Sequence, residues 1–329
     1  MSRDSDPIVR EGVPARVRRL ARPGAIREYG IVLSFVALFL VLTFSSDAFF
    51  TQRNILSILN QQAPTLIIAA AGTLVIIAGG FDISVGAVYA LAGVVGTKVA
   101  LEVNPYVGMA VGIAIGLGTG LLNGAVATVG RINSLIATLA SSFVFRGIAI
   151  VITTGSVFLI DDMRYAGLGQ NNVFGVKIAI WIAALWVGAL WFVLTRTVFG
   201  RFVFASGDNP EAARLAGVRV NVVRTATFAL SGLAASLAGV IASSRFQSGQ
   251  ADVGTGLEFT VIAGIVVGGT SILGGEGAIW RTVLGVLFIA LIGNGFTLLE
   301  VDPIYQQIVQ GGIIIVAVAV DAWSRSRRA

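Results

Sequence analysis

An acidic side chain lies where two apolar stretches meet, at Asp82 in the segment GGFDISVG. A carboxylate at membrane depth is costly unless it is paired, hydrated or placed at a helix N-terminus, so this residue is a candidate for function. Two interpretations stay open. Asp82 and Ser84 could cap a helix that begins at Val85, or Asp82 could line a transport pathway.

Other polar residues within apolar stretches extend this set. The further candidate pathway residues are Gly79, Gly80, Ser84, Asn123 and Asn133. For the amides we favour hydrogen bonds between helices, and the same holds for Asn294, Gln306, Gln307 and Gln310. Arg146, in SSFVFRGIAIV, could pair with a carboxylate or with carbonyls, or extend to the membrane surface.

The chain lacks the residues that several kinds of catalytic and metal-binding chemistry require. It contains no Cys and no His, which excludes thiolate catalysis, imidazole metal sites and histidine acid–base chemistry. A phosphate-binding loop needs Gly-Lys-Ser/Thr, and the only lysines are Lys98 in GTKVA and Lys177 in GVKIA. We therefore predict no catalytic residue, no metal and no cofactor, and we expect that energy for any driven transport enters through another subunit.

The composition predicts a polytopic membrane protein. Of the 329 residues 56% are hydrophobic and 12% are charged, about half the charged share of a soluble domain. Ten apolar segments, most of them near the ~20 residues that cross a bilayer, give an all-α bundle. They are 29–45, 63–79, 83–101, 106–128, 133–154, 174–195, 224–244, 257–273, 278–299 and 303–323.

The net charge of +6 follows the membrane topology and does not indicate nucleic-acid binding. With the N-terminus inside, 16 of the 23 basic residues fall on the cytoplasmic side, as the positive-inside rule requires. The predicted domains are a basic tail at 1–28, a permease domain at 29–323 and a basic tail at 324–329, with both termini cytoplasmic. A cleaved signal peptide ending near Ser46-Asp47-Ala48 is the less favoured alternative for the N-terminus.

One cytoplasmic loop, residues 196–224, contains a short helix with strong end signals. Asn209 can cap it, Pro210 suits its first position, and Glu211 complements its positive end. Gly217 is placed to end the helix in a left-handed conformation. Two turns of helix are too short to persist alone in water, so we expect this helix to dock against a partner.

Small residues recur at helical spacing. Gly108, Gly112, Gly116, Gly120 and Gly124 follow one another every fourth position, which predicts a helix face that approaches its neighbours closely. Shorter faces of this kind occur at Gly86, Ala90, Gly93 and Thr97 and at Gly264 and Gly268. Segments 79–93 and 268–285 also resemble each other, which could reflect an internal duplication or shared composition.

Five segments together resemble the permease subunits of bacterial ABC importers for simple sugars, of the ribose, xylose, arabinose and galactose type. The resemblance covers nearly all of the membrane part. The segments are GGFDISVGAVYALAGVV, INSLIATLASSFVFRGIAIVITTG, FGRFVFASGDNPEAARLAGVRV, VVGGTSILGGEGAIW and GNGFTLLEVDPIYQQIVQGGIIIVAVAVD.

The resemblance implies a function and its partners. Two permease subunits, identical or related, would enclose one pathway in the bacterial inner membrane for a pentose or hexose. A separate cytoplasmic ATPase would use the ATP, and a periplasmic or lipid-anchored binding protein would deliver the sugar. The residues that match the family's ATPase-coupling stretch are Asn209, Pro210, Glu211, Ala212, Ala213, Arg214 and Gly217, and Asp82 matches the acidic position of its GG-[IF]-D-[IL]-S-V-G segment.

Two positions depart from the family pattern, and three other functions remain. Glu276 stands where relatives often carry Arg or Lys, and Arg281 where Gly is frequent, which could alter the fit to the ATPase. Related permeases carry nucleosides, branched-chain amino acids or sugar-like signals. A stand-alone secondary transporter is less favoured because Asp82 is its only acidic candidate, and an intramembrane enzyme is least favoured because paired acids are lacking.

Overall fold

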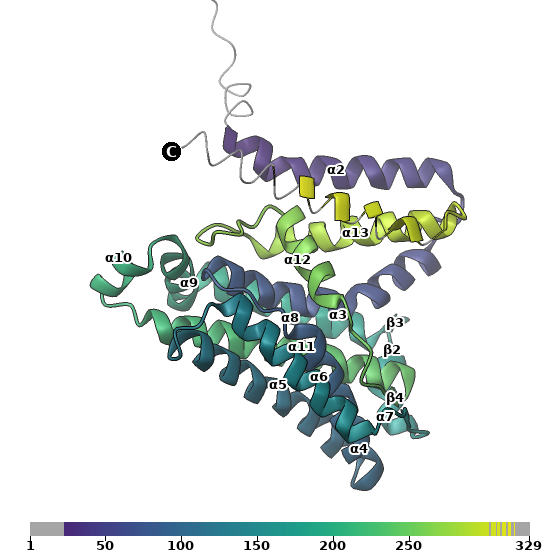
Figure 1. Ribbon diagram of the computed structural model, residues 1–329. Coiled ribbons are helices and arrows are strands. Elements are labelled where there is room, and N and C mark those ends of the chain that lie inside the picture. The colour runs from purple at the N-terminus through teal and green to yellow at the C-terminus, as the bar shows by residue number, and fades with distance from the viewer. Residues whose placement is uncertain are drawn as a thin grey trace, which may run out of the picture.

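The computed structural model describes residues 23–302 and, beyond them, 304–306, 308–309, 311–313, 315–316 and 319. The expected all-α fold is confirmed (Figure 1). In chain order the helices are α2 Pro23–Ser45, α3 Gln52–Ile77, α4 Val85–Glu102, α5 Pro105–Thr128, α6 Ser134–Thr153, α7 Met163–Gln170, α8 Ile178–Arg196, α9 Val198–Asp208, α10 Pro210–Leu215, α11 Val220–Phe246, α12 Leu257–Val267 and α13 Ile279–Leu298.

Seven of the described helices are long and apolar enough to cross a membrane, namely α3, α4, α5, α6, α8, α11 and α13. The apolar parts of two more, Gly30–Ser45 and Leu257–Val267, are shorter. Ten of the 21 residues of the tenth expected segment, 303–323, lie outside the described residues, Gln307 and Gln310 among them. The tail at 324–329 lies outside them too, as does all of the tail at 1–28 except the backbone from Pro23 on. The total of ten spans therefore stays a prediction.

The centre of the bundle is formed by α3, α4 and α11. Their apolar windows are 78%, 67% and 72% buried, against 28% or less for α5, α6 and α8. The predicted small-residue faces explain this close packing. All five glycines of the α5 face are buried, and there a Cβ would overlap atoms of α4 or α11, such as the carbonyl oxygens of Gly96, Gly232 and Phe228.

The second predicted span, 63–79, begins eleven residues after the start of the observed helix. Helix α3 begins at Gln52 and contains Pro64 in its interior. A proline there supplies no N–H to the carbonyl four residues earlier, which normally breaks a helix. That carbonyl belongs to Asn60, and Nη1 of Arg245, at the end of α11, lies 3.5 Å from its oxygen. A cation from another helix thus partly replaces the donor.

Two further boundaries differ from the prediction, and the structure adds two short strand pairs. The start of the segment 174–195 is occupied by a hairpin of β2 Asn172–Val173 and β3 Val176–Lys177 before α8 begins. The segment 257–273 ends its helix at Val267. The connections from α6 to α7 and from α11 to α12 also contain the pair β1 Phe158–Leu159 and β4 Ser248–Gly249. Two-residue strands are too short for sequence alternation to reveal them.

The two similar segments at 79–93 and 268–285 begin with the same helix end. In α3, Gly79 at φ +82° lets the Gly80 amide donate to the Val75 carbonyl. In α12, Gly269 at φ +81° does the same for Thr270 and Ile265. Both are helix ends of the left-handed glycine type. Whether the segments arose by duplication stays a prediction.

Candidate functional site

The predicted capped helix is α10, and each of its end signals is present. The Asn209 side chain accepts a hydrogen bond from the Ala212 amide at 2.9 Å, and Pro210 takes the first position. Gly217 has φ +87°, and the amide of the next residue, Val218, donates back to the Ala213 carbonyl. The helix itself comprises six residues, Pro210–Leu215. Its sequence therefore encodes both ends locally.

The outer surface of α10 is polar at one edge and apolar at its tip. Glu211 and Arg214 form an exposed ion pair at 3.2 Å. Leu215 is 85% exposed, while Ala213 is buried toward the protein. The helix lies at one extremity of the molecule, at the far end from α7 and the hairpin β2–β3 (Figure 1). A surface of this kind is available to a partner.

Helix α9, which the sequence did not predict, joins α10 to the membrane helices. Its N-cap is Thr197, whose hydroxyl accepts from the Gly200 amide at 3.3 Å. Near its other end, Gly207 lies directly against the C-terminal end of α3. A Cβ on Gly207 would overlap the Ile77 carbonyl oxygen and come within 2.7 Å of the Gly275 nitrogen. The Gly275 amide itself donates to Ile77 O at 2.9 Å.

Arg224, in the first turns of α11, holds this contact together. Its Nε donates to Ala78 O at 2.9 Å and its Nη2 donates to Ser206 O at 3.0 Å. One guanidinium thus links the end of α3 to the end of α9. We call the contacts among Ile77, Ala78, Gly207, Gly275 and Arg224 the junction. It was missed in the sequence because Arg224 is distant in the chain from Ala78 and resembles any basic residue of a cytoplasmic loop.

The segment that carries Asp82 follows the junction and is bound to α6. The Phe81 amide donates to Ser134 Oγ and the Ile83 amide to Thr138 Oγ1, each at 3.0 Å. Asp82 Oδ1 accepts from the Ser84 amide at 3.0 Å and from the Ser84 hydroxyl at 2.6 Å. The backbone between α3 and α4 is therefore held at every second residue.

Asp82 is buried, with 8% of its surface exposed. Burial raises the pKa of its carboxyl, and the hydrogen bonds from Ser84 oppose that shift. Oδ2 of Asp82 and the Ser231 hydroxyl of α11 are both buried, and neither has a hydrogen-bond partner among the described residues. Asp82 closes a turn just before α4, whose N-cap residue is Ser84.

The structure brings together some of the candidate pathway residues but not all. Asn123 Nδ2 donates to Ser84 Oγ at 2.7 Å, so Asp82, Ser84 and Asn123 form one buried network. Gly80 packs against the Phe228 ring. Asn133 is exposed and caps α6 by accepting from the Leu135 amide at 3.0 Å. The pathway role of the set, which also includes Gly79, stays a prediction.

For the transport function that the resemblance implies, we expect Asp82→Asn to leave uptake within about twofold of wild type. An amide oxygen can keep both bonds from Ser84, and the stability change should stay within the ~0.5–1.5 kcal/mol of one hydrogen bond. The measurement is substrate uptake per folded transporter, quantified by size-exclusion chromatography. A large loss of uptake at normal yield would instead assign Asp82 to the pathway.

Comparison with known proteins places these features in a family. The model of a family described as branched-chain amino acid transport system / permease component matches residues 54–318. The chain belongs to this permease family. A permease component is a transport subunit, and together with the long apolar helices this makes the chain a multi-pass inner-membrane protein.

Curated relatives match over almost the full length of the permease. The ribose import permease of Escherichia coli K12 is 37% identical over 309 residues, covering 92% of this chain and 96% of the relative. An L-arabinose ABC transporter permease of Azospirillum brasilense is 36% identical over 304 residues, covering 92% and 90%. The ribose import permease of Bacillus subtilis 168 is 36% identical over 314 residues, covering 94% and 98%.

Arg146 of the permease binds carbonyls, one of the partners considered for it. Its Nη1 donates to Ala251 O at 2.6 Å and to Val253 O at 2.8 Å. These carbonyls belong to the loop between β4 and α12. An arginine within α6 thus satisfies backbone groups that have no place in a helix or sheet.

The two positions that depart from the family pattern lie near the junction. Glu276 is exposed in the turn after α12 that also carries Gly275. Arg281, in the first turn of α13, has its guanidinium carbon 6.0 Å from the centre of the Trp280 ring. Both positions are thus close in sequence to the turn that contacts α9. Their effect on the fit to the ATPase stays a prediction.

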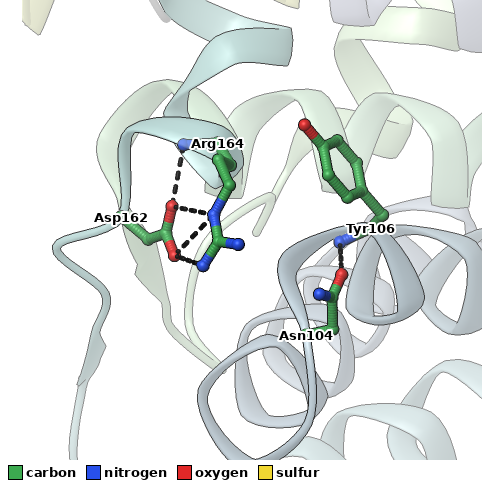
Figure 2. A network of polar contacts seen from close by, with 4 residues as sticks. All are labelled: Asn104, Tyr106, Asp162 and Arg164. Carbon is green, nitrogen blue, oxygen red and sulfur yellow. Dashed lines mark hydrogen bonds and ion pairs between the residues drawn. The ribbon is translucent and has the colours of Figure 1, made fainter.

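At the opposite end of the permease, α7 and α5 begin with capped turns (Figure 2). Asp162 accepts from the Arg164 amide at 2.8 Å and pairs with its guanidinium, also at 2.8 Å. That guanidinium holds the pKa of the Asp162 carboxyl below its usual range. Asn104 accepts from the Tyr106 amide at 2.9 Å. Tyr165, fully buried, anchors α7 to α11 through Ser243.

Proposed function

We propose that this permease is the transmembrane subunit of an ABC importer for a simple sugar, a pentose or hexose. The observation that carries the proposal is full-length similarity to ribose and L-arabinose permeases. In that system a separate ATPase uses the ATP and an extracytoplasmic protein, periplasmic or lipid-anchored, delivers the sugar. A second permease copy, identical or related, completes the pathway.

We also propose that α10 is the contact surface for the ATPase. Its exposed ion pair and Leu215 offer a docking surface, and the junction gives that surface a mechanical connection to the membrane helices. A displacement of α10 and α9 would act on the carbonyl end of α3 through Arg224. The positive-inside distribution supports this orientation, with α10 and both termini in the cytoplasm.

Reconstitution tests the proposed function. Proteoliposomes that contain the permease, its ATPase and its binding protein should take up D-ribose or L-arabinose when ATP is supplied. The permease alone should show no sugar flux. Sugar uptake by the permease without an ATPase would contradict the proposal and favour a secondary transporter.

A second candidate substrate is a branched-chain amino acid, which the family description favours. Uptake of L-leucine in place of either sugar, in the same proteoliposomes, would select it. Nucleosides and sugar-like signals are tested in the same assay by competition.

Replacing Glu211 and Arg214 together with alanine should reduce co-purification of the ATPase at least tenfold. The pair is exposed, and such pairs add only about 0.2–1 kcal/mol to stability, so insertion and folding should be unchanged. The matched control is Lys98→Ala with Glu102→Ala, an exposed pair at 4.0 Å near the end of α4. Normal ATPase binding by the Glu211 and Arg214 double variant would refute the proposed contact.

A further inference from the structure

A cavity of about 290 Å³ lies between α3, α12 and α13. Its size is near the lower end of the roughly 300–1,000 Å³ typical of small-molecule sites. The polar residues that line it are Gln61, Gln62, Thr260, Asn294, Thr297 and Gln306. The remaining lining residues are Ile58, Ile289, Ala290 and Gly293. None of the ten carries a charge or an aromatic ring.

Such a lining selects a chemical class of ligand. Each amide offers donors and an acceptor, and each hydroxyl offers both, which matches the donor and acceptor character of sugar hydroxyls. A zwitterionic amino acid would leave its charges without ionic partners here, which is costly in a low-dielectric site. A nucleobase would find no ring on which to stack. A neutral polyhydroxylated molecule is the best fit.

Hydrogen bonds hold part of this lining in place. Asn294 and Asn54 exchange amide hydrogen bonds at 2.9 and 3.0 Å, which fixes α13 against α3. The Thr297 hydroxyl donates to the Gly293 carbonyl at 3.1 Å and keeps its lone pairs for a ligand. Gln62, half-buried, makes no hydrogen bond to any residue that the structure describes. Its amide is therefore free to bind a solute.

The two helices that supply most of the cavity lining, α3 and α13, are both connected to the junction. From Gln62 to Ile77 α3 runs about 22 Å at 1.5 Å per residue, so the cavity and the junction lie toward opposite ends of this helix. The Gly275 amide, in the turn before α13, donates to the Ile77 carbonyl. A movement of α9 would therefore reach α3 directly and α13 through that turn.

We propose that this cavity is a sugar-binding station in the outer half of the translocation pathway, where Gln62 and Thr297 contact the hydroxyls of a monosaccharide. This inference rests on the proposed function. It assigns the station to residues other than the Asp82 network, which is packed at the other end of α3. Opening and closing of the station would follow the position of α9 at the junction.

Cysteine labelling in the assembled importer tests the station, because the chain has no native cysteine. Gln62→Cys and Thr297→Cys should react with a water-soluble methanethiosulfonate, and the imported sugar, D-ribose or L-arabinose, should slow the reaction at least threefold. L-leucine should not slow it. The control is Gln52→Cys, exposed at the start of the same helix and outside the cavity, which should be labelled but not protected.

Uptake kinetics supply the second readout. Gln62→Leu and Thr297→Val should raise the KM for the sugar at least fivefold while ATPase co-purification stays at wild-type level, and Gln62→Asn should recover part of the loss. If the wild-type assembly imports sugar but both variants match it and neither cysteine is protected, the station is wrong and the proposed function stands. If the wild-type assembly imports L-leucine and neither sugar, the proposed function and the ligand class both fail.

Discussion

Gly207→Ala is expected to reduce ATP-driven uptake at least tenfold. The new Cβ would overlap the Ile77 carbonyl oxygen and press on the Gly275 amide. Both are backbone atoms, so neither can rotate away. If α9 stays in place, the Cβ pushes the Gly275 amide away from the Ile77 carbonyl, and if α9 separates from α3, Ser206 is pulled from Arg224.

The magnitudes favour disruption at Gly207. Alanine gains at most about 1 kcal/mol over glycine within a helix. Overpacking typically costs about 1–3 kcal/mol, and overlap with fixed backbone is the upper part of that range. Because the clash is at the edge of the membrane bundle, the seven long helices should still insert. The folded yield should therefore fall less than transport does.

Uptake per folded transporter measures this effect. Gly188→Ala in α8 is the matched control, since a Cβ there meets no atom within 4 Å. It should transport at the wild-type rate. Wild-type uptake by the Gly207 variant would mean that α9 is not seated on α3, and the junction would lose its role.

Gly116→Ala should lower the folded yield and reduce the melting temperature by several degrees. Its Cβ would overlap the Ser236 hydroxyl and the Gly232 carbonyl oxygen, where α5 meets α11. The bond from Ser236 Oγ to the Ile113 carbonyl, 3.0 Å long, would break as well. Helix association in membranes depends on such close backbone contact, so the whole α5 face would be affected.

The comparison variant is Gly118→Ala, two residues along the same helix. A Cβ there meets nothing within 4 Å, so its melting temperature should equal or exceed that of wild type. Thermal unfolding in detergent, followed by tryptophan fluorescence, compares the two. Equal melting temperatures for both alanine variants would show that α5 does not pack through its predicted face.

Local sequence patterns predicted much of the fold. The four-residue glycine spacing predicted which face of α5 is buried, because a helix brings every fourth side chain to the same side. Asn209, Pro210 and Gly217 predicted both ends of α10, because capping depends on neighbours within one turn. Apolar length predicted most of the membrane helices, since the bilayer sets the length of a span.

Those local patterns did not predict contacts between residues that are far apart in the chain. The predicted segment 63–79 begins beside Pro64, and only the approach of Arg245 from α11 to the Asn60 carbonyl shows how α3 continues through that proline. Asp82 was open between two roles, and its bonds with Ser84 and the buried Asn123 define its surroundings. Asn294 and Gln306 were expected to bond between helices. Asn294 does so with Asn54, but both residues also line the cavity.

The sequence by itself therefore determined the membrane class, the glycine faces and the capped α10, all of which depend on residues within a few turns of one helix. Only the tertiary structure placed Arg224 across the ends of α3 and α9 and gathered amides from three segments around one cavity. The physical reason is that these features join groups far apart in the chain. Their geometry exists only after the helices have packed.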